Sequence, residues 1–195
     1  MADEAGVGRL LVASVHQGIA DVLPTRLEFY ESWLNPSGLR GGRIGVAPMA
    51  AVLSFLRLEG PAYTLVAERA GDYTAEWAVS ELGRVHRAVL DAAPPAIRAR
   101  LVMRLARTLI RSSYGGSRIA VRWTKGKAEL DIRGSIFCEV RDRVEQPLCA
   151  YYAAAIVRLM ALFRLEAEVT TDRCRATRDA TGCLMALTVR PAVGA

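Results

Sequence analysis

The chain has 195 residues, which suits one large domain or one domain with an extension. Its 52% hydrophobic and 24% charged residues allow a sizeable core and exclude disorder over most of the length. No stretch reaches the ~20 apolar residues that cross a bilayer, and the acidic start Met-Ala-Asp-Glu is unlike a secretory signal. We therefore expect a cytoplasmic protein without a membrane span. The net charge of +6 comes largely from arginines without aromatic or polar base-reading neighbours, so we expect no nucleic-acid partner.

The first part of the chain predicts a helical extension. Apolar residues recur at helical spacing over residues 8–34, with an interruption near Pro24. Turn-forming residues then follow from Asn35 to Gly42. We accordingly divide the chain into an N-terminal helical extension, residues 1–41, and a ligand-binding domain, residues 42–195.

The second domain begins with predicted helices. One is expected over Pro48–Leu58, and another starts at Gly71-Asp72, with Asp72 as its N-cap, and runs to Leu90. Tyr63–Ala67 is a short apolar connector or helix. Pro94-Pro95 then opens an amphipathic helix that carries Leu101, Leu105 and Leu109 on one side and arginines on another.

The period changes from helix to strand near residue 119. Ile119, Val121 and Trp123 alternate with polar residues, Lys125-Gly126 forms a turn, and Leu130 and Ile132 continue the alternation. Residues 136–140 suggest a third strand. A nearly all-apolar helix over residues 148–163 must be buried, and strands follow at 167–171 and 184–189. The fold class is α+β, with helices followed by an antiparallel sheet and one long buried helix.

The four cysteines suggest a metal site or a set of buried thiols. Cys174 and Cys183 flank a predicted hairpin connection, and Cys149 stands at a helix start, where the helix dipole favours a thiolate. Three such thiolates and a fourth ligand could hold a tetrahedral Zn²⁺. Free cysteine also packs as a small hydrophobe, so the spacing leaves both interpretations open.

The C-terminal run QPLCAYYAAAIVRLMALFRLEAEVTTDRCRATRDATGCLMALTV resembles the bacteriochlorophyll 4-vinyl reductase family. The upstream segments GRIGVAPMAAVL and AGDYTAEWAV are similar to that family's opening and helical motifs. The resemblance implies a fold shared with TRAPP-type tethering subunits and with phenol-responsive sensor domains. It also implies a zinc site with Cys149, Cys174 and Cys183 as sulfur ligands. Thr171 replaces the family's glutamate, so Cys138 or Asp172 would have to substitute.

A ligand cavity is expected beside the buried helix. Its candidate lining residues are Trp77, Trp123, Tyr151 and Tyr152, and His86 is a candidate ligand to a tetrapyrrole metal. Core packing for the aromatic residues and a surface position for the histidine are the alternatives. The arginines at 100, 104, 107 and 111 could clamp an acidic group or form a solvated helix face.

Three functions follow from these residues and the resemblance. The first is a non-catalytic carrier or accessory protein that binds a hydrophobic small molecule, a tetrapyrrole of bacteriochlorophyll-type metabolism, with a structural zinc. The second is a 4-vinyl reductase acting on a divinyl chlorophyllide. It has weak support because no Gly-x-Gly-x-x-Gly nucleotide site is present. The third is a TRAPP-like homodimeric interaction module.

Overall fold

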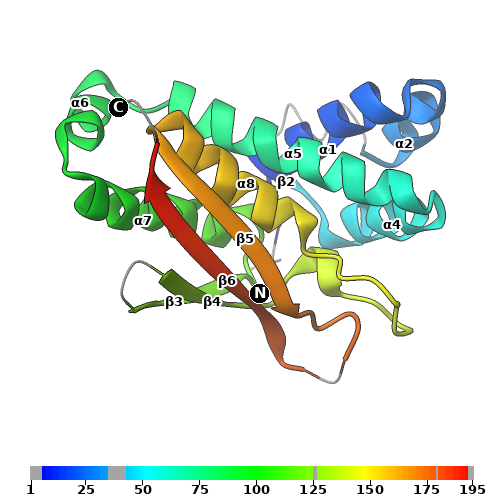
Figure 1. Cartoon of the computed structure of the whole chain (residues 1–195). Coiled ribbons are helices and arrows are strands. Elements are labelled where there is room, and N and C mark those ends of the chain that lie inside the picture. Colours follow the sequence, from blue (N-terminus) through cyan, green and yellow to red (C-terminus); the bar gives the residue numbers. More distant parts are fainter. Residues whose placement is uncertain (1–5, 35–42, 125–126, 179, 193–195) are drawn as a thin grey trace, which may run out of the picture.

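The computed structural model describes residues 6–34, 43–124, 127–178 and 180–192. They form an α+β fold in which helices cover one face of an antiparallel sheet (Figure 1). The sheet has four strands in the order β3-β4-β6-β5. The strands are β3 (Arg118–Thr124), β4 (Lys127–Arg133), β5 (Leu165–Arg173) and β6 (Gly182–Pro191). The predicted fold class is confirmed at this level.

The helices precede the sheet, apart from one. They are α1 (Arg9–Val22), α2 (Leu27–Leu34), α4 (Val46–Leu58), α5 (Pro61–Ser80), α6 (Arg84–Ala92), α7 (Pro95–Ser113) and α8 (Ala150–Leu162). Short 3-10 turns, η1 (Pro24–Arg26) and η2 (Ile136–Cys138), and a small ribbon of β1 (Val7–Gly8) and β2 (Arg43–Ile44) complete the described elements.

The buried helix α8 is the centre of the molecule. Its apolar residues leave it no polar face, so it packs between β5 on one side and α5 on the other. In Figure 1, β5 runs across α8, α5 lies alongside α8, and α1 packs on α5. A buried hydrogen-bond chain from Tyr151 to Thr74 to Ser14 then joins α8, α5 and α1. The predicted helix over residues 148–163 is confirmed.

Helix α5 differs from the prediction at its start and its end. It begins at Pro61, so Tyr63–Ala67 belongs to it and Asp72 lies in its interior rather than at an N-cap. Gly71 is present for a packing reason, because a Cβ there would lie 2.8 Å from the Ala155 backbone nitrogen of α8. The predicted continuation to Leu90 is also wrong: the helix ends at Ser80, and α6 starts at Arg84.

The predicted third strand at residues 136–140 is wrong as well. Residues 136–138 form η2, whose start is capped by the Ser135 hydroxyl accepting the Cys138 N–H. The place beside β4 is taken by β6, which pairs Ile132 with Cys183. The alternation of Ile136, Cys138 and Val140 therefore reflects a buried loop and not a pleated strand.

The proposed extension contains α1 and α2. Leu11, Val15 and Ile19 of α1 are buried in the common core, and α1 packs along α5. The predicted linker at 35–42, the domain boundary at 41/42 and the turn at Lys125-Gly126 lie outside the described residues.

Candidate metal centre

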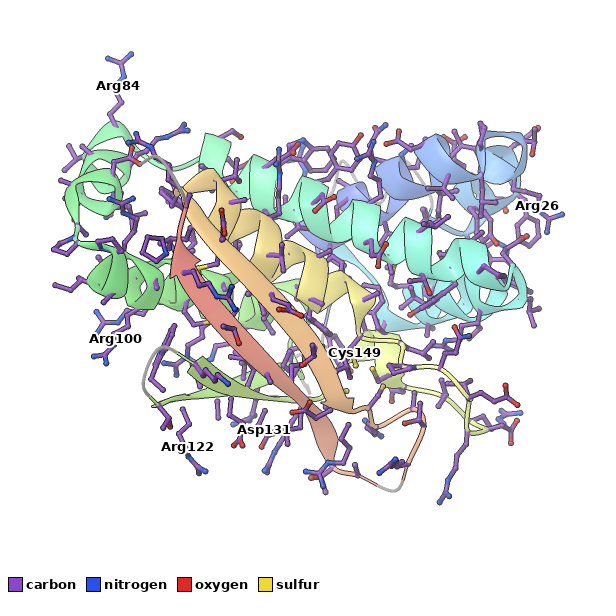
Figure 2. All side chains as sticks on the ribbon, viewed as in Figure 1. Arg26, Arg84, Arg100, Arg122, Asp131 and Cys149 are labelled. Atoms are coloured by element: carbon purple, nitrogen blue, oxygen red, sulfur yellow. The ribbon has the colours of Figure 1, made fainter. Side chains whose placement is uncertain are left out.

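All four cysteines converge in space from four separate parts of the chain. Cys138 ends η2, Cys149 is the N-cap residue of α8, Cys174 follows β5, and Cys183 lies in β6. The end of β5 and the start of β6 therefore lie beside the start of α8, where Cys149 is labelled in Figure 2, and the four sulfur atoms gather there. The fourth sulfur therefore comes from Cys138, whereas Asp172 is exposed and outside the cluster.

The sulfur positions approximate a tetrahedron. Cys138 Sγ lies 3.4 Å from Cys149 Sγ, 3.6 Å from Cys174 Sγ and 3.4 Å from Cys183 Sγ. Cys149 and Cys174 are 3.2 Å apart, Cys174 and Cys183 are 3.9 Å apart, and all four sulfurs lie within 4.8 Å of one another. A tetrahedral ion with metal–sulfur bonds of about 2.3 Å needs sulfur–sulfur edges of roughly 3.8 Å. All four cysteines are free thiols.

The electrostatics of the cluster favour a bound cation. Hydrogen bonds with Cys138 and Cys149 lower the pKa of Cys174, whereas hydrogen bonding with Cys138 and the other thiols, together with burial, raises that of Cys149. Buried thiols this close cannot all ionise without a positive charge among them. A metal ion would supply that charge, and the thiolates are the form that binds it.

Backbone groups and two further side chains hold the cysteines in place. The Arg175 N–H donates to Cys183 Sγ at 3.5 Å. Arg57 from α4 donates to the carbonyl oxygens of Phe137 and Glu139 on either side of Cys138. The buried Tyr63 hydroxyl donates to the carbonyl oxygen of Leu148, next to Cys149. No local pattern marked Arg57 or Tyr63, because they act from helices far away in the sequence.

The proposed ligand-lining residues do not form one group. Tyr151 and Tyr152 are buried and pack on the ring of Phe137, with centroids 4.6 and 5.6 Å away. Trp77 stacks on Tyr73. Trp123 lines a pocket near the N-terminal end of α7.

His86 is exposed on α6, away from these aromatic residues. His16, the other histidine, is part-buried and hydrogen-bonds the Glu31 carboxylate at 2.8 Å. Neither imidazole lines any of five pockets formed by the described residues.

Comparison with known structures identifies the fold. An H-NOX protein from S. oneidensis in its Fe(II)NO state has a TM-score of 0.63 at 11% identity, covering 94% of this chain and 99% of that one. The Fe(II) unliganded H-NOX protein from K. algicida gives 0.60 at 10% identity, with coverage of 95% and 98%. The fold is that of H-NOX proteins.

The sequence comparisons identify nothing further. No family model matches the chain, and no curated protein matches it. The assignment to the 4-vinyl reductase family is therefore wrong, and the name TRAPP-like has no support, because the similar structures are H-NOX proteins. The pigment-carrier function, the reductase alternative and the link to bacteriochlorophyll biosynthesis are corrected with it. The tetrapyrrole ligand and the homodimer rested on the same resemblance and lose their basis.

The fold family implies haem, but the histidines and cysteines of the described residues are not placed to hold one. Haem iron takes an axial ligand such as His, Cys, Met or Tyr. Neither histidine lines any of those five pockets, and the cysteines are turned towards one another. The space beside Tyr151 in the helical core is only about 10 Å³, because side chains fill it.

The expectation of zinc is corrected as well. The similar structures that name a metal name Fe(II), and the chain itself provides only the donor set. Four thiolates suit more than one thiophilic metal. Among the described residues, no helix is long and apolar enough to cross a membrane.

Proposed function

We propose that this chain is a non-catalytic metal–thiolate domain built on an H-NOX fold. Cys138, Cys149, Cys174 and Cys183 together bind one thiophilic metal ion. The observation that carries the proposal is the mutual approach of these sulfurs, at 3.2–3.9 Å for the pairs in contact, from four separate segments.

The closed donor set favours a structural role for the ion. Structural tetrahedral sites use four protein ligands, whereas catalytic sites keep one position for water or substrate. Here four buried sulfurs occupy the corners of the tetrahedron, and the cysteines line none of those five pockets of the described residues. The ion would fasten the start of α8 to η2 and to the β5–β6 hairpin.

Packing of free thiols is the alternative, since buried cysteine behaves as a small hydrophobe. Packing accounts for the burial of each cysteine, but it gives no reason for every cysteine of the chain to meet at one point. It also gives no reason for an N–H donor aimed at Cys183 Sγ. Both features are expected of a thiolate site, where N–H groups stabilise the sulfur charge.

Elemental analysis of protein purified without chelator tests the proposal. We expect one metal ion per chain, lost in Cys174→Ser and in Cys138→Ser. Ala176→Ser is the matched control, because it adds a hydroxyl to the same buried segment and removes no sulfur. It should retain the ion.

Cobalt(II) provides a second readout that does not depend on the native metal. A tetrahedral tetrathiolate Co²⁺ absorbs strongly in the visible and near ultraviolet, unlike aqueous Co²⁺. We expect those bands when one equivalent is added to the metal-free protein. Purified protein without metal, together with cobalt spectra equal to those of the ion in buffer, would refute the metal site.

A further inference from the structure

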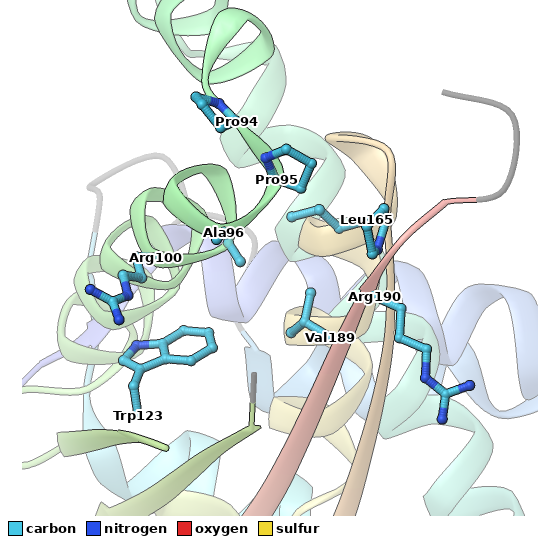
Figure 3. Close-up of a pocket in the computed structure, with 10 residues that line it drawn as sticks. Pro94, Pro95, Ala96, Arg100, Trp123, Leu165, Val189 and Arg190 are labelled. Carbon is cyan, nitrogen blue, oxygen red and sulfur yellow. The ribbon is translucent and has the colours of Figure 1, made fainter. Parts of the chain in front are cut away.

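The end of the sheet far from the cysteines contains an apolar pocket of about 470 Å³. It lies between the start of α7 and the strands β3, β5 and β6 (Figure 3). Leu165, Val189 and the indole of Trp123 form its inner walls, and Pro95 closes it from the side of α7. Arg100 and Arg190 stand at its two ends, with their guanidinium groups turned outward.

A second, polar pocket of about 310 Å³ adjoins the first. The two share Arg100 and Trp123, and the second also touches Arg104 and Arg107 of α7 and Val121 of β3. Arg100, Arg104 and Arg107 recur at helical spacing on one face of α7, and they line this pocket together with residues of β3. An apolar chamber therefore opens beside a cationic one, with Trp123 between them.

The cationic chamber has no counter-charge of its own. No acidic residue lines either pocket, and none of Arg100, Arg104 and Arg107 forms an ion pair within the described residues. Arg98, on the same helix, instead donates to carbonyl oxygens of Asp91 and Phe163.

Arg107 supplies a second, independent observation. Its Nε atom is buried and has no hydrogen-bond partner in the described structure. A buried donor without an acceptor is costly, so an acceptor supplied by a ligand would remove the deficit. Binding of an anionic ligand would also reduce the electrostatic repulsion among the three guanidinium groups.

We propose that the two chambers, here called the α7–β3 groove, bind a small amphipathic anion. The apolar tail lies against Trp123, Leu165 and Val189, and a carboxylate or phosphate head accepts hydrogen bonds from Arg100, Arg104 and Arg107. A volume of about 470 Å³ lies within the roughly 300–1,000 Å³ range of small-molecule sites, so an apolar tail of medium length fits. This site is independent of the metal centre.

Calorimetric titration of the full-length, metal-containing protein tests the proposal, with octanoate and octyl phosphate as probes. We expect binding of at least one probe, and weaker binding of both octanol and inorganic phosphate, because each lacks half of the ligand. Equal binding of octanoate and octanol would overturn the role of the arginines. Equal binding of octyl phosphate and inorganic phosphate would overturn that of the apolar chamber.

Arg104→Gln should weaken binding about tenfold, since hydrogen bonds to charged groups are among the stronger ones. Arg111→Gln is the matched control, because Arg111 is an exposed arginine of the same helix that lines neither pocket. It should change binding by less than about twofold. Equal weakening by the two substitutions would overturn the site and would indicate general charge attraction.

Fluorescence of Trp123 keeps the test independent of any arginine variant. Trp33 and Trp77 lie elsewhere, so the double substitution Trp33→Phe and Trp77→Phe leaves Trp123 as the single reporter. Its emission should shift with octanoate at concentrations at which octanol, the weaker ligand, leaves it unchanged. Vesicles of phosphatidylglycerol form the last arm: binding to them that octanoate does not displace would overturn the proposal in favour of a membrane surface.

Discussion

The dependence of folding stability on free metal concentration is the most demanding test of metal binding by the cysteine cluster. The four sulfurs lie within 4.8 Å of one another, which leaves room for one ion. A ligand that binds only the folded state stabilises it by RT ln(1 + [L]/Kd), so each tenfold rise in free metal above Kd should add about 1.4 kcal/mol per ion. At a free concentration 100 times Kd the gain is about 2.7 kcal/mol.

The assay is urea denaturation at several buffered concentrations of the metal that elemental analysis finds. The free energy of unfolding should rise by about 1.4 kcal/mol per decade in the unsubstituted chain and in Ala176→Ser, and should stay flat in Cys174→Ser. A flat response of the unsubstituted chain over several decades would refute the reasoning. A slope near 2.8 kcal/mol per decade would mean two ions, which the sulfur distances do not allow.

Three further predictions concern haem, packing and pH. Haemin added to the purified protein should give the spectrum of free haemin, unchanged by His16→Ala or His86→Ala; a stoichiometric shift of its main absorption band would contradict the packed interior. Gly71→Ala should lower the free energy of unfolding by about 1–3 kcal/mol in urea melts, because the added Cβ would push α5 away from α8. Gly83→Ala is the control, since its Cβ would meet only His86 Nδ1, at 3.9 Å. It should change the free energy of unfolding by less than about 1 kcal/mol. Hydrogen bonds from Tyr73 and, to a smaller extent, from Gln17 lower the pKa of Asp21 from 3.8. The stability that this carboxylate contributes is therefore present above its unfolded-state pKa and is lost as pH falls through its lower folded-state pKa. Asp21→Asn should therefore destabilise the protein at pH 7 and converge with the unsubstituted chain in acid; a difference that is independent of pH would contradict this assignment.

Element types were predictable where local periodicity was strong. The alternation around Ile119–Trp123 and the apolar run of α8 correspond to a strand and a buried helix in the structure. Predictions were wrong where a residue serves a distant contact. Gly71 resembled a helix start, but it lies inside α5 where α8 approaches closely, and the alternation near Cys138 belongs to a capped 3-10 turn.

Family resemblance was the weakest part of the sequence argument. The motif with three cysteines correctly predicted that Cys149, Cys174 and Cys183 lie close together in the fold. It did not identify the relatives, because the similar structures are H-NOX proteins at 10–12% identity. A fold constrains layers and helix crossings, so it persists when its ligand-binding residues have changed.

The sequence alone determined that helices precede an antiparallel sheet, that α8 must be buried, and that few groups are able to bind a metal. These features depend on residue type and on neighbours a few positions away. Only the tertiary structure decided that Cys138 is the fourth sulfur of the cluster, that Arg57 supports it, and that α7 meets β3 with arginines that form no ion pair among the described residues. Such contacts join segments that lie tens of residues apart in the sequence. These segments meet because of the strand order and the helix crossings, which no local pattern encodes.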